Sequence, residues 1–385
     1  DLPNGDWWGF SMMDFMSVGR TTFLSPVTWQ DSWPYFGLPG NLGRSPRTWI
    51  KPDVVAVTTP AAPYQRSDDF SGPKLQSVWQ WNHNPVDGKW ELNKKRGSLR
   101  LYAQPAKDFL WARNTLTQRV IGPESSATTV LDGSGLKPGD IAGLAYLNMP
   151  YAYLGVVRTN DGYLLRFYDQ YTNKTIEEKL PSGKVSLRAT GNYEKEIAQL
   201  SFSTDGNTFI NIGDSIHLPY QLKTFQGSRY ALFAYNTDGK EGGYADFEDF
   251  KVIEPLADRT NNIPLGKIIT LTNMGTDLPV WANPHGMMHS TRQGSKESDG
   301  PGCQFRVHDR GKGRVVLEAI NGTGFITVVG IGISGDVRLL KVESEGSLFQ
   351  WQDLLHNQCM LLSLKTNRFV GLIPGTGEPY SADRP

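Results

Sequence analysis

Two aspartates near the start of the chain, Asp14 and Asp31, carry the side chains that acid–base hydrolysis requires. Asp14 follows the apolar run at residues 8–13, and Asp31 precedes Ser32-Trp33-Pro34 in a predicted turn. Hydrolysis of a glycosidic bond commonly uses two carboxyl groups about 5–9 Å apart, one on each side of the bond. Nothing in the surrounding sequence marks either aspartate as an acid or a base. Structural carboxylates, bonded to solvent or to the protein, are therefore favoured.

Two further motifs in the last third of the chain match known binding sites only in part. Residues 330–335 read Gly-Ile-Gly-Ile-Ser-Gly, the glycine spacing of a dinucleotide-binding turn. That turn needs a following helix to hold pyrophosphate, whereas residues 336–342 predict a strand, so no nucleotide site is expected. His285 and His289 have a helical metal spacing inside a turn-rich stretch, and we expect no zinc site there.

The composition excludes several classes of protein. The 385 residues carry 39 Lys+Arg and 39 Asp+Glu, which argues against a duplex-DNA-binding protein with its basic surplus. The sequence contains no run of 18 apolar residues, so no membrane span is predicted. Cys303 and Cys359 are too few for a disulfide framework and are predicted to be buried thiols. The 41 glycines, 24 prolines and 11% aromatic residues favour an all-β protein, often of a kind that binds sugars.

The sequence divides into three blocks joined by two connectors. The first block, residues 1–52, holds five of the eleven tryptophans. Residues 53–66 are rich in Thr, Ala and Pro and predict an extended, semi-rigid linker. Residues 67–254 form the second block, 255–264 the second connector, and 265–385 the third block.

The middle block alternates apolar and polar residues in short runs. Strands are predicted near residues 98–103, 141–147, 163–168, 197–203 and 229–235. Hairpin turns are predicted at Asn160-Asp161-Gly162 and Thr204-Asp205-Gly206-Asn207. A block of this size with only short strands predicts a jelly-roll β-sandwich.

The third block repeats itself at intervals of about 45 residues. Val316-Leu317-Glu318-Ala319 matches residues 361–364, and Gly324-Phe325-Ile326 matches the region of Arg368-Phe369-Val370. An earlier copy begins near Ile269. Three copies of this length, each with about four short strands, predict a β-trefoil-like module whose third copy stops at Pro385, before its closing aromatic residue.

The first block resembles a known family. Asn4-Gly5-Asp6-Trp7-Trp8-Gly9-Phe10 and the stretch from Gly19 to Pro34 resemble the last part of the five-bladed β-propeller of family 43 glycoside hydrolases, the β-xylosidases and α-L-arabinofuranosidases. The middle block is similar to the C-terminal concanavalin-like module of these enzymes, through Ser67-Asp68-Asp69-Phe70 and residues 244–250. The resemblance covers roughly residues 1–254. The trefoil looks like an appended carbohydrate-binding or structural module.

This resemblance implies a secreted or periplasmic exo-acting hydrolase that releases xylose or arabinofuranose from xylan or arabinoxylan by inversion. The family's catalytic Asp, second Asp and general-acid Glu lie in earlier propeller blades, and none of those segments is present here. The chain is therefore expected to be a portion of a larger protein, inactive alone. Its expected partners are plant cell-wall saccharides and the remaining blades, in the same or a separate chain; neither nucleic acid nor membrane is expected.

Two residues are expected to contact substrate. Arg20 matches a family arginine that points into the glycone subsite, although a structural arginine paired with Asp14 or Asp31 is equally consistent with the sequence. In related enzymes a sandwich loop places an aromatic residue near the substrate pocket, and Phe225 is the best positional match. Phe225 as ordinary core filler is the alternative. The aromatic surface of residues 32–40 also predicts that the sandwich packs against the propeller segment.

A structural calcium ion is expected in the sandwich. Asp69 lies at the first strand of the middle block and Asp246 at the last, and these strands commonly lie side by side in a sandwich. Their carboxylates, with backbone carbonyls, could form an oxygen cage. The alternative is two exposed acidic strand ends.

A different function remains open from the sequence: a non-catalytic carbohydrate-binding protein made of the sandwich and the trefoil. Tyr151, Tyr153, Trp281 and Trp351 could stack on sugar faces. Core filling is favoured for each of them, because sandwich and trefoil interiors need aromatic side chains.

Overall fold

The computed structural model describes residues 1–52, 54, 65–224, 226–255, 263–283, 285–290, 301–331, 336–373 and 377–382. The predicted all-β class is confirmed, because every regular element in these residues is a strand or a short 3₁₀ helix. None of them forms a helix with the length and apolar character of a membrane span. The chain divides into a sandwich unit, residues 12–21 with 59–258, and a repeat unit, residues 1–11 and 22–58 with 259–385.

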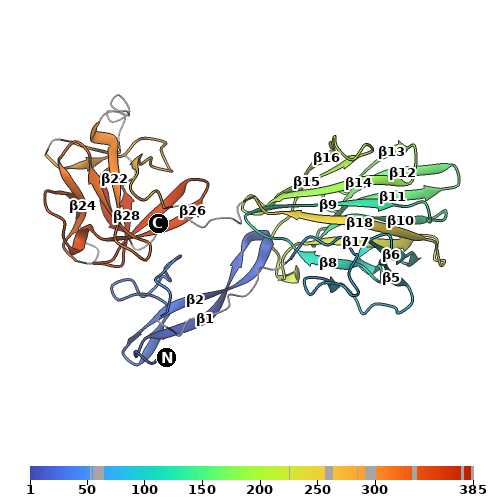
Figure 1. The fold of residues 1–385 in the computed structure, drawn as a ribbon, viewed down its shortest axis with the longest axis horizontal. Helices are drawn as coiled ribbons and strands as arrows, with labels where there is room; N and C mark the ends of the chain where they lie inside the picture. Colours follow the sequence, from blue (N-terminus) through green and yellow to red (C-terminus); the bar gives the residue numbers. More distant parts are fainter. Residues whose placement is uncertain are drawn as a thin grey trace. The chain divides into compact units, whose positions relative to one another are not determined.

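The sandwich unit contains two large sheets (Figure 1). The first has eight strands, in the order β13 (Lys174–Leu180), β12 (Gly162–Asp169), β11 (Ala152–Thr159), β10 (Asp140–Leu147), β17 (Arg229–Asn236), β8 (Leu116–Arg119) and β4 (Gln80–Trp81), with β7 (Gln104–Pro105) paired to β17. The second has seven, in the order β16 (Ile210–His217), β15 (Ile197–Ser203), β14 (Lys184–Asn192), β9 (Glu124–Asp132), β18 (Tyr244–Ile253), β6 (Ser98–Tyr102) and β5 (Trp90–Asn93). All five predicted strands and both predicted hairpins are present.

The main core lies between these sheets. It includes Leu144 and Leu232 from the first sheet and Leu131 and Leu187 from the second, all fully buried. β9 alternates between buried and half-buried residues, as a strand with one solvated face should. β10, β11 and β17 instead are buried on almost every residue. An aromatic cluster under the 3₁₀ helix η2 (Phe109–Trp111) covers their second face.

A separate three-stranded sheet is made of β1 (Trp7–Phe15), β2 (Gly19–Gln30) and β3 (Trp33–Tyr35), with η1 (Met16–Val18) between the first two. Asp31 and Ser32 form the turn between β2 and β3, both with positive φ, as a two-residue hairpin turn requires. This confirms the turn predicted at Asp31.

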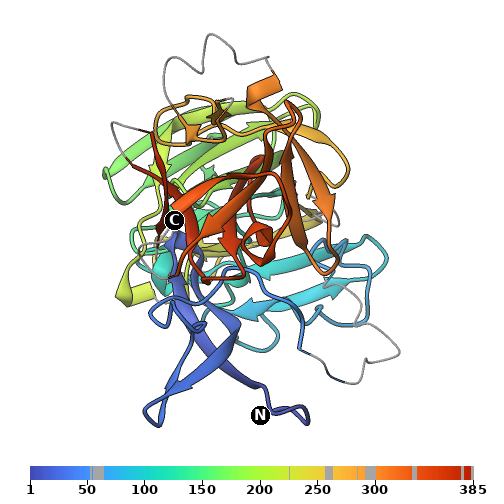
Figure 2. The same cartoon turned by 90° about the vertical axis from the view of Figure 1, so that its left-hand side faces the viewer.

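The repeat unit shows the internal repeat of the sequence in its strands. The first copy has β19 (Ile268–Thr270), β20 (Trp281–Ala282) and β21 (Met288–His289); the second has β22 (Gln304–Asp309), β23 (Arg314–Ala319), β24 (Gly324–Val329) and β25 (Asp336–Leu340); the third has β26 (Phe349–Leu355), β27 (Gln358–Ser363), β28 (Phe369–Leu372) and β29 (Pro379–Ala382). β19 pairs with β22, and the equivalent β23 pairs with β26. The second and third copies are the orange and red strands in Figure 2.

The last hairpins of the three copies close on one another. Met287 bridges to Arg338, and Asp336 at the start of β25 pairs with Tyr380 of β29. Ser290 N donates to Gly377 O at 2.9 Å and completes the ring. This three-way closure is the arrangement of a β-trefoil. β25 also confirms that a strand, not a helix, follows residues 330–335, although residues 332–335 lie outside the described part.

Both cysteines lie in the repeat unit as thiols; the predicted burial is confirmed for Cys303, whereas Cys359 is half-buried. Cys303 is buried, and burial raises the pKa of the Cys359 thiol to about 12. The other small helices of the described residues are η3 (Leu222–Thr224), η4 (Pro301–Cys303) and η6 (Glu345–Ser347).

Candidate functional site

The turn between β1 and β2 is fixed to the sandwich, within the sandwich unit, by hydrogen bonds to the backbone carbonyls of the turn. Ser228 N donates to Ser17 O at 2.8 Å, just before β17 begins. Arg119, at the end of β8, donates from Nη2 to Val18 O at 3.3 Å and to Arg20 O at 3.1 Å. Part of the first block therefore packs on the sandwich, and the sandwich holds the backbone that carries Arg20.

Two glycines allow this close approach. Gly19 and Gly227 both have positive φ, a conformation that favours glycine. A Cβ atom at Gly227 would collide with the Val18 carbonyl, and a Cβ at Gly19 would collide with the backbone at Gly227. The two backbones thus meet where no side chain fits between them.

Arg20 forms an ion pair with Asp14, from Nε to Oδ1 at 3.2 Å. This is the structural pairing that the sequence left open, and it shows that Asp14 is a partner of an arginine. Both side chains are partly exposed, at 38% for Arg20 and 47% for Asp14. The Asp14 carboxylate raises the pKa of Arg20, and it also raises the pKa of the neighbouring Tyr220 phenol. Arg20 is therefore a permanent cation that faces both solvent and the sandwich residue Tyr220.

Phe225, the second residue expected to contact substrate, lies outside the described residues. Residues on both sides of it contact the Arg20 hairpin: Tyr220 lies beside Arg20, and Gly227 and Ser228 meet the turn. The segment that contains Phe225 is thus tied to the Arg20 hairpin at both ends. Arg119 and Tyr220 were not found from the sequence, because their positions are about 100 and 200 residues from Arg20 and no local pattern marks them.

The carboxylates of Asp69 and Asp246 each bind partners within the protein. Asp69 accepts hydrogen bonds from Ser71 N at 3.0 Å and Ser71 Oγ at 2.7 Å, which lower the pKa of its carboxyl. Asp246 is buried and accepts from Arg100 Nε at 2.8 Å and Nη2 at 2.9 Å. A carboxylate bound by a guanidinium fork does not fit a calcium cage. No group of three or more His, Cys, Asp or Glu in the described residues is placed to hold a metal.

The acidic residue Asp246 of the last sandwich strand is explained by its ion pair with Arg100 instead of by a calcium site. The register of β6 and β18 places the two residues directly opposite each other, and the Asp246 carboxylate raises the pKa of Arg100. The Arg100 guanidinium also lies 3.7 Å from the centre of the Tyr244 ring. Calcium binding by this chain stays a prediction. The partners of Asp69 and Asp246 in the structure do not support it.

We expect Asp246→Asn to lower the free energy of unfolding by about 3 kcal/mol, because it leaves the mostly buried Arg100 guanidinium with only the exposed Glu91 carboxylate, 3.4 Å from Nη1, as an ionic partner among the described residues. Urea unfolding of the chain measures this difference. Asp249→Asn is the matched control, since Asp249 lies on the same strand but is exposed and, among the residues that the structure describes, pairs only with Lys251; it should change the free energy by less than about 0.5 kcal/mol. Equal effects of the two variants would refute the structural role of the pair.

The four aromatic residues considered for sugar stacking are mostly core residues. Tyr151 and Tyr153 are 5% exposed and belong to the cluster under η2. Trp351 is 8% exposed in the trefoil core. Trp281 is half-buried, with its ring 5.5 Å from that of His289. Buried rings cannot stack on a polysaccharide, so three of the four are core fillers.

Comparison with known proteins places the sandwich in a family. Residues 67–253 match the model of the β-xylosidase C-terminal concanavalin A-like domain. A β-xylosidase of Formosa agariphila is 31% identical over 279 residues, which cover 64% of this chain and 46% of the relative. A non-reducing end α-L-arabinofuranosidase of Bacteroides ovatus is 34% identical over 107 residues, covering 26% of this chain and 19% of the relative.

A solved structure, described as a bifunctional GH43-CE protein of Bacteroides eggerthii, is similar with a TM-score of 0.59 and 34% identity, covering 67% of this chain and 34% of that one. The chain thus spans less than half the length of each of these proteins. The match of the concanavalin A-like model begins and ends within one residue of the predicted middle block. Residues 67–253 therefore belong to the family of concanavalin A-like domains found at the C-terminus of family 43 β-xylosidases, as the resemblance predicted.

Proposed function

We propose that this chain is the C-terminal part of a secreted or periplasmic family 43 glycoside hydrolase that releases xylose or arabinofuranose from xylan or arabinoxylan. The match of residues 67–253 to the β-xylosidase domain carries the proposal. The β-xylosidase relative covers 64% of the chain, whereas the domain model covers about half of it, so the similarity extends beyond the sandwich.

Apolar side chains are exposed on both faces of the three-stranded sheet, and this supports the proposal that the sheet is part of a propeller blade. Successive residues of a strand point to opposite faces. On β1, Phe10 and Met12 lie on one face, and Phe10 is 75% exposed. Trp7 and Met13 lie on the other face, and both are exposed by more than 40%. A sheet with apolar residues on both faces needs a neighbour on each side, and a propeller blade has two such neighbours.

We assign the two catalytic carboxylates to propeller blades outside the printed sequence, in the same or a separate chain. In an inverting hydrolase the general acid protonates the leaving oxygen while the base activates a water on the opposite face of the sugar. In that reaction, this chain positions the substrate. Arg20, held by Asp14 and by the backbone contacts of Arg119, supplies fixed N–H donors that orient sugar hydroxyls. Tyr220 and Ser228, which lie on either side of Phe225 in the sequence, contact the same hairpin.

The proposal is tested on the protein expressed with its upstream region. We expect hydrolysis of aryl β-D-xylopyranoside or α-L-arabinofuranoside, with the released sugar first appearing in the inverted anomeric form by NMR. Release of the retained anomer would reject the inverting scheme. An absence of hydrolysis on both aryl glycosides and on arabinoxylan would reject the enzyme and favour the alternative, a non-catalytic carbohydrate-binding protein.

A further inference from the structure

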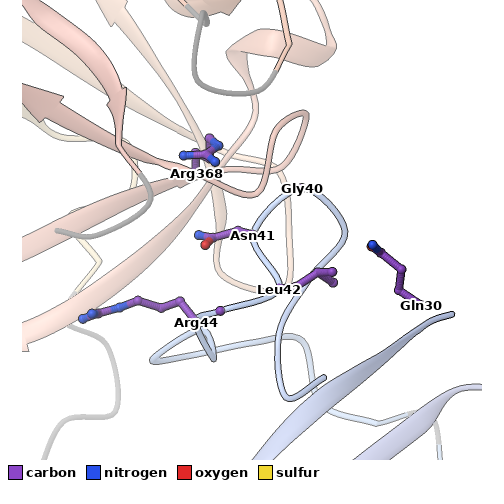
Figure 3. Close-up of a pocket in the computed structure, with 7 residues that line it drawn as sticks. Gln30, Gly40, Asn41, Leu42, Arg44 and Arg368 are labelled. Atoms are coloured by element: carbon purple, nitrogen blue, oxygen red, sulfur yellow. The ribbon is translucent and has the colours of Figure 1, made fainter. Parts of the chain in front are cut away.

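A pocket of about 370 Å³ lies in the repeat unit, between the segment that follows β3 and the loop that joins β27 to β28. It is lined by Gln30, Gly40, Asn41, Leu42, Gly43, Arg44 and Arg368 (Figure 3). Neither the sequence motifs nor the proposed hydrolysis assigns a role to these residues.

The two walls of the pocket are fixed to each other. Asn41 Nδ2 donates to Asn367 O at 2.8 Å, and Asn367 Nδ2 donates back to Pro39 O at 2.8 Å. Gly40 has positive φ, and a Cβ there would lie only 2.9 Å from Thr366 O. Beneath them, Leu38 packs with Phe369 in a small apolar cluster. The pocket is therefore built by specific contacts between distant parts of the sequence.

Two arginines in this pocket have no carboxylate. Neither Arg44 nor Arg368 forms an ion pair with any residue that the structure describes, whereas Arg20, Arg100 and Arg310 each do. The Nε of Arg368 is also shielded from solvent and has no hydrogen-bond partner among those residues. A buried donor without a partner is costly to folding. An anionic ligand beside the two guanidinium groups would balance the charge that no carboxylate of the described residues balances.

We propose that this pocket binds the carboxylate of a uronic acid unit on an acidic saccharide. A guanidinium fork matches the two oxygens of a planar carboxylate and can donate two parallel hydrogen bonds. The amide of Gln30 and the apolar side chain of Leu42 line the same pocket and suit the hydroxyls and ring carbons of a sugar. The saccharide class rests on the proposed function, because xylan chains carry uronic acid branches; the preference for an anion rests on the arginines alone.

Calorimetric titration of the chain with glucuronic-acid-substituted xylo-oligosaccharide tests the proposal. We expect binding that the unsubstituted oligosaccharide of equal length does not show. Arg368→Gln and Arg44→Gln should each weaken it at least tenfold, and Arg368→Lys should weaken it less than Arg368→Gln. Arg306→Gln is the matched control, since Arg306 is an exposed arginine of the same unit outside the pocket lining; it should leave the affinity unchanged.

Thermal unfolding separates binding from a structural role. Because Arg368 Nε has no partner to lose, Arg368→Gln should not lower Tm, and a clear drop would assign the residue to folding instead. Equal affinity for the substituted and unsubstituted oligosaccharides would overturn the proposal. Inorganic phosphate or sulfate binding as tightly as the uronate would overturn the saccharide part. Since these titrations need no hydrolysis, their failure is distinct from a failure of the proposed enzyme activity.

Discussion

Replacing Arg20 with glutamine in the complete enzyme is expected to lower kcat/KM for an aryl glycoside by about 10²–10³-fold, the typical effect of removing one preorganised donor from an active site. Three contacts fix this side chain or the backbone of the hairpin that carries it: Asp14 at 3.2 Å, and two hydrogen bonds from Arg119 to the carbonyls of Val18 and Arg20. A fixed donor does not have to be ordered when substrate binds, so its removal should affect the reaction strongly.

Two variants control this experiment. Arg20→Lys keeps the charge but loses the planar fork, and it should recover only part of the activity. Arg113→Gln removes an exposed arginine of the same unit, whose Nη2 donates to Asn84 O, and it should leave kcat/KM unchanged. If Arg20→Gln is as active as Arg113→Gln, Arg20 has only the structural role of pairing with Asp14.

Gly227→Ala is expected to destabilise the contact between the β1–β2 turn and the sandwich by about 3 kcal/mol, combining the cost of positive φ with a backbone collision at Val18. For a unit of this size, about 1 kcal/mol corresponds to 2–4 °C in Tm. Either Tm falls by about 6–12 °C, or the turn detaches and becomes sensitive to protease while the sandwich stays folded.

Gly206→Ala provides the matched control for this glycine. Gly206 has nearly the same φ, +79° against +78° for Gly227, but no atom lies within 4 Å of the Cβ position. The Gly206→Ala variant should therefore lose only the free energy that the positive φ costs an alanine, about 1 kcal/mol. If the two variants behave alike in both Tm and proteolysis, the close approach of the two backbones is not important for stability.

The strands of the sandwich could be predicted because alternation of apolar residues is a local pattern. Residues 197–203 were predicted as a strand and form β15 with the same bounds. The trefoil could be predicted for a related reason: each copy buries the same positions, so the apolar residues recur at a fixed interval. β19, β23 and β27 occupy equivalent places in the three copies.

The contacts that define the candidate sites could not be predicted in this way, because they depend on register and on distant packing. The sequence suggested Asp246 as a calcium ligand, but strand register places it opposite Arg100. The aromatic surface of residues 32–40 was expected to pack on the sandwich. In the structure, Leu38 and Trp49 pack with trefoil residues of the same unit. Amphipathic patterns show that a surface is covered; they do not identify the partner.

The central claim is that this chain positions substrate but does not contain the catalytic carboxylates. The most direct measurement is the turnover of nitrophenyl xyloside and arabinofuranoside by the isolated 385 residues, beside the protein with its upstream region. We predict no turnover above the uncatalysed rate for the isolated chain and clear turnover for the longer protein. Turnover by the isolated chain that survives repurification would contradict the account, because a complete catalytic site would then lie within these residues.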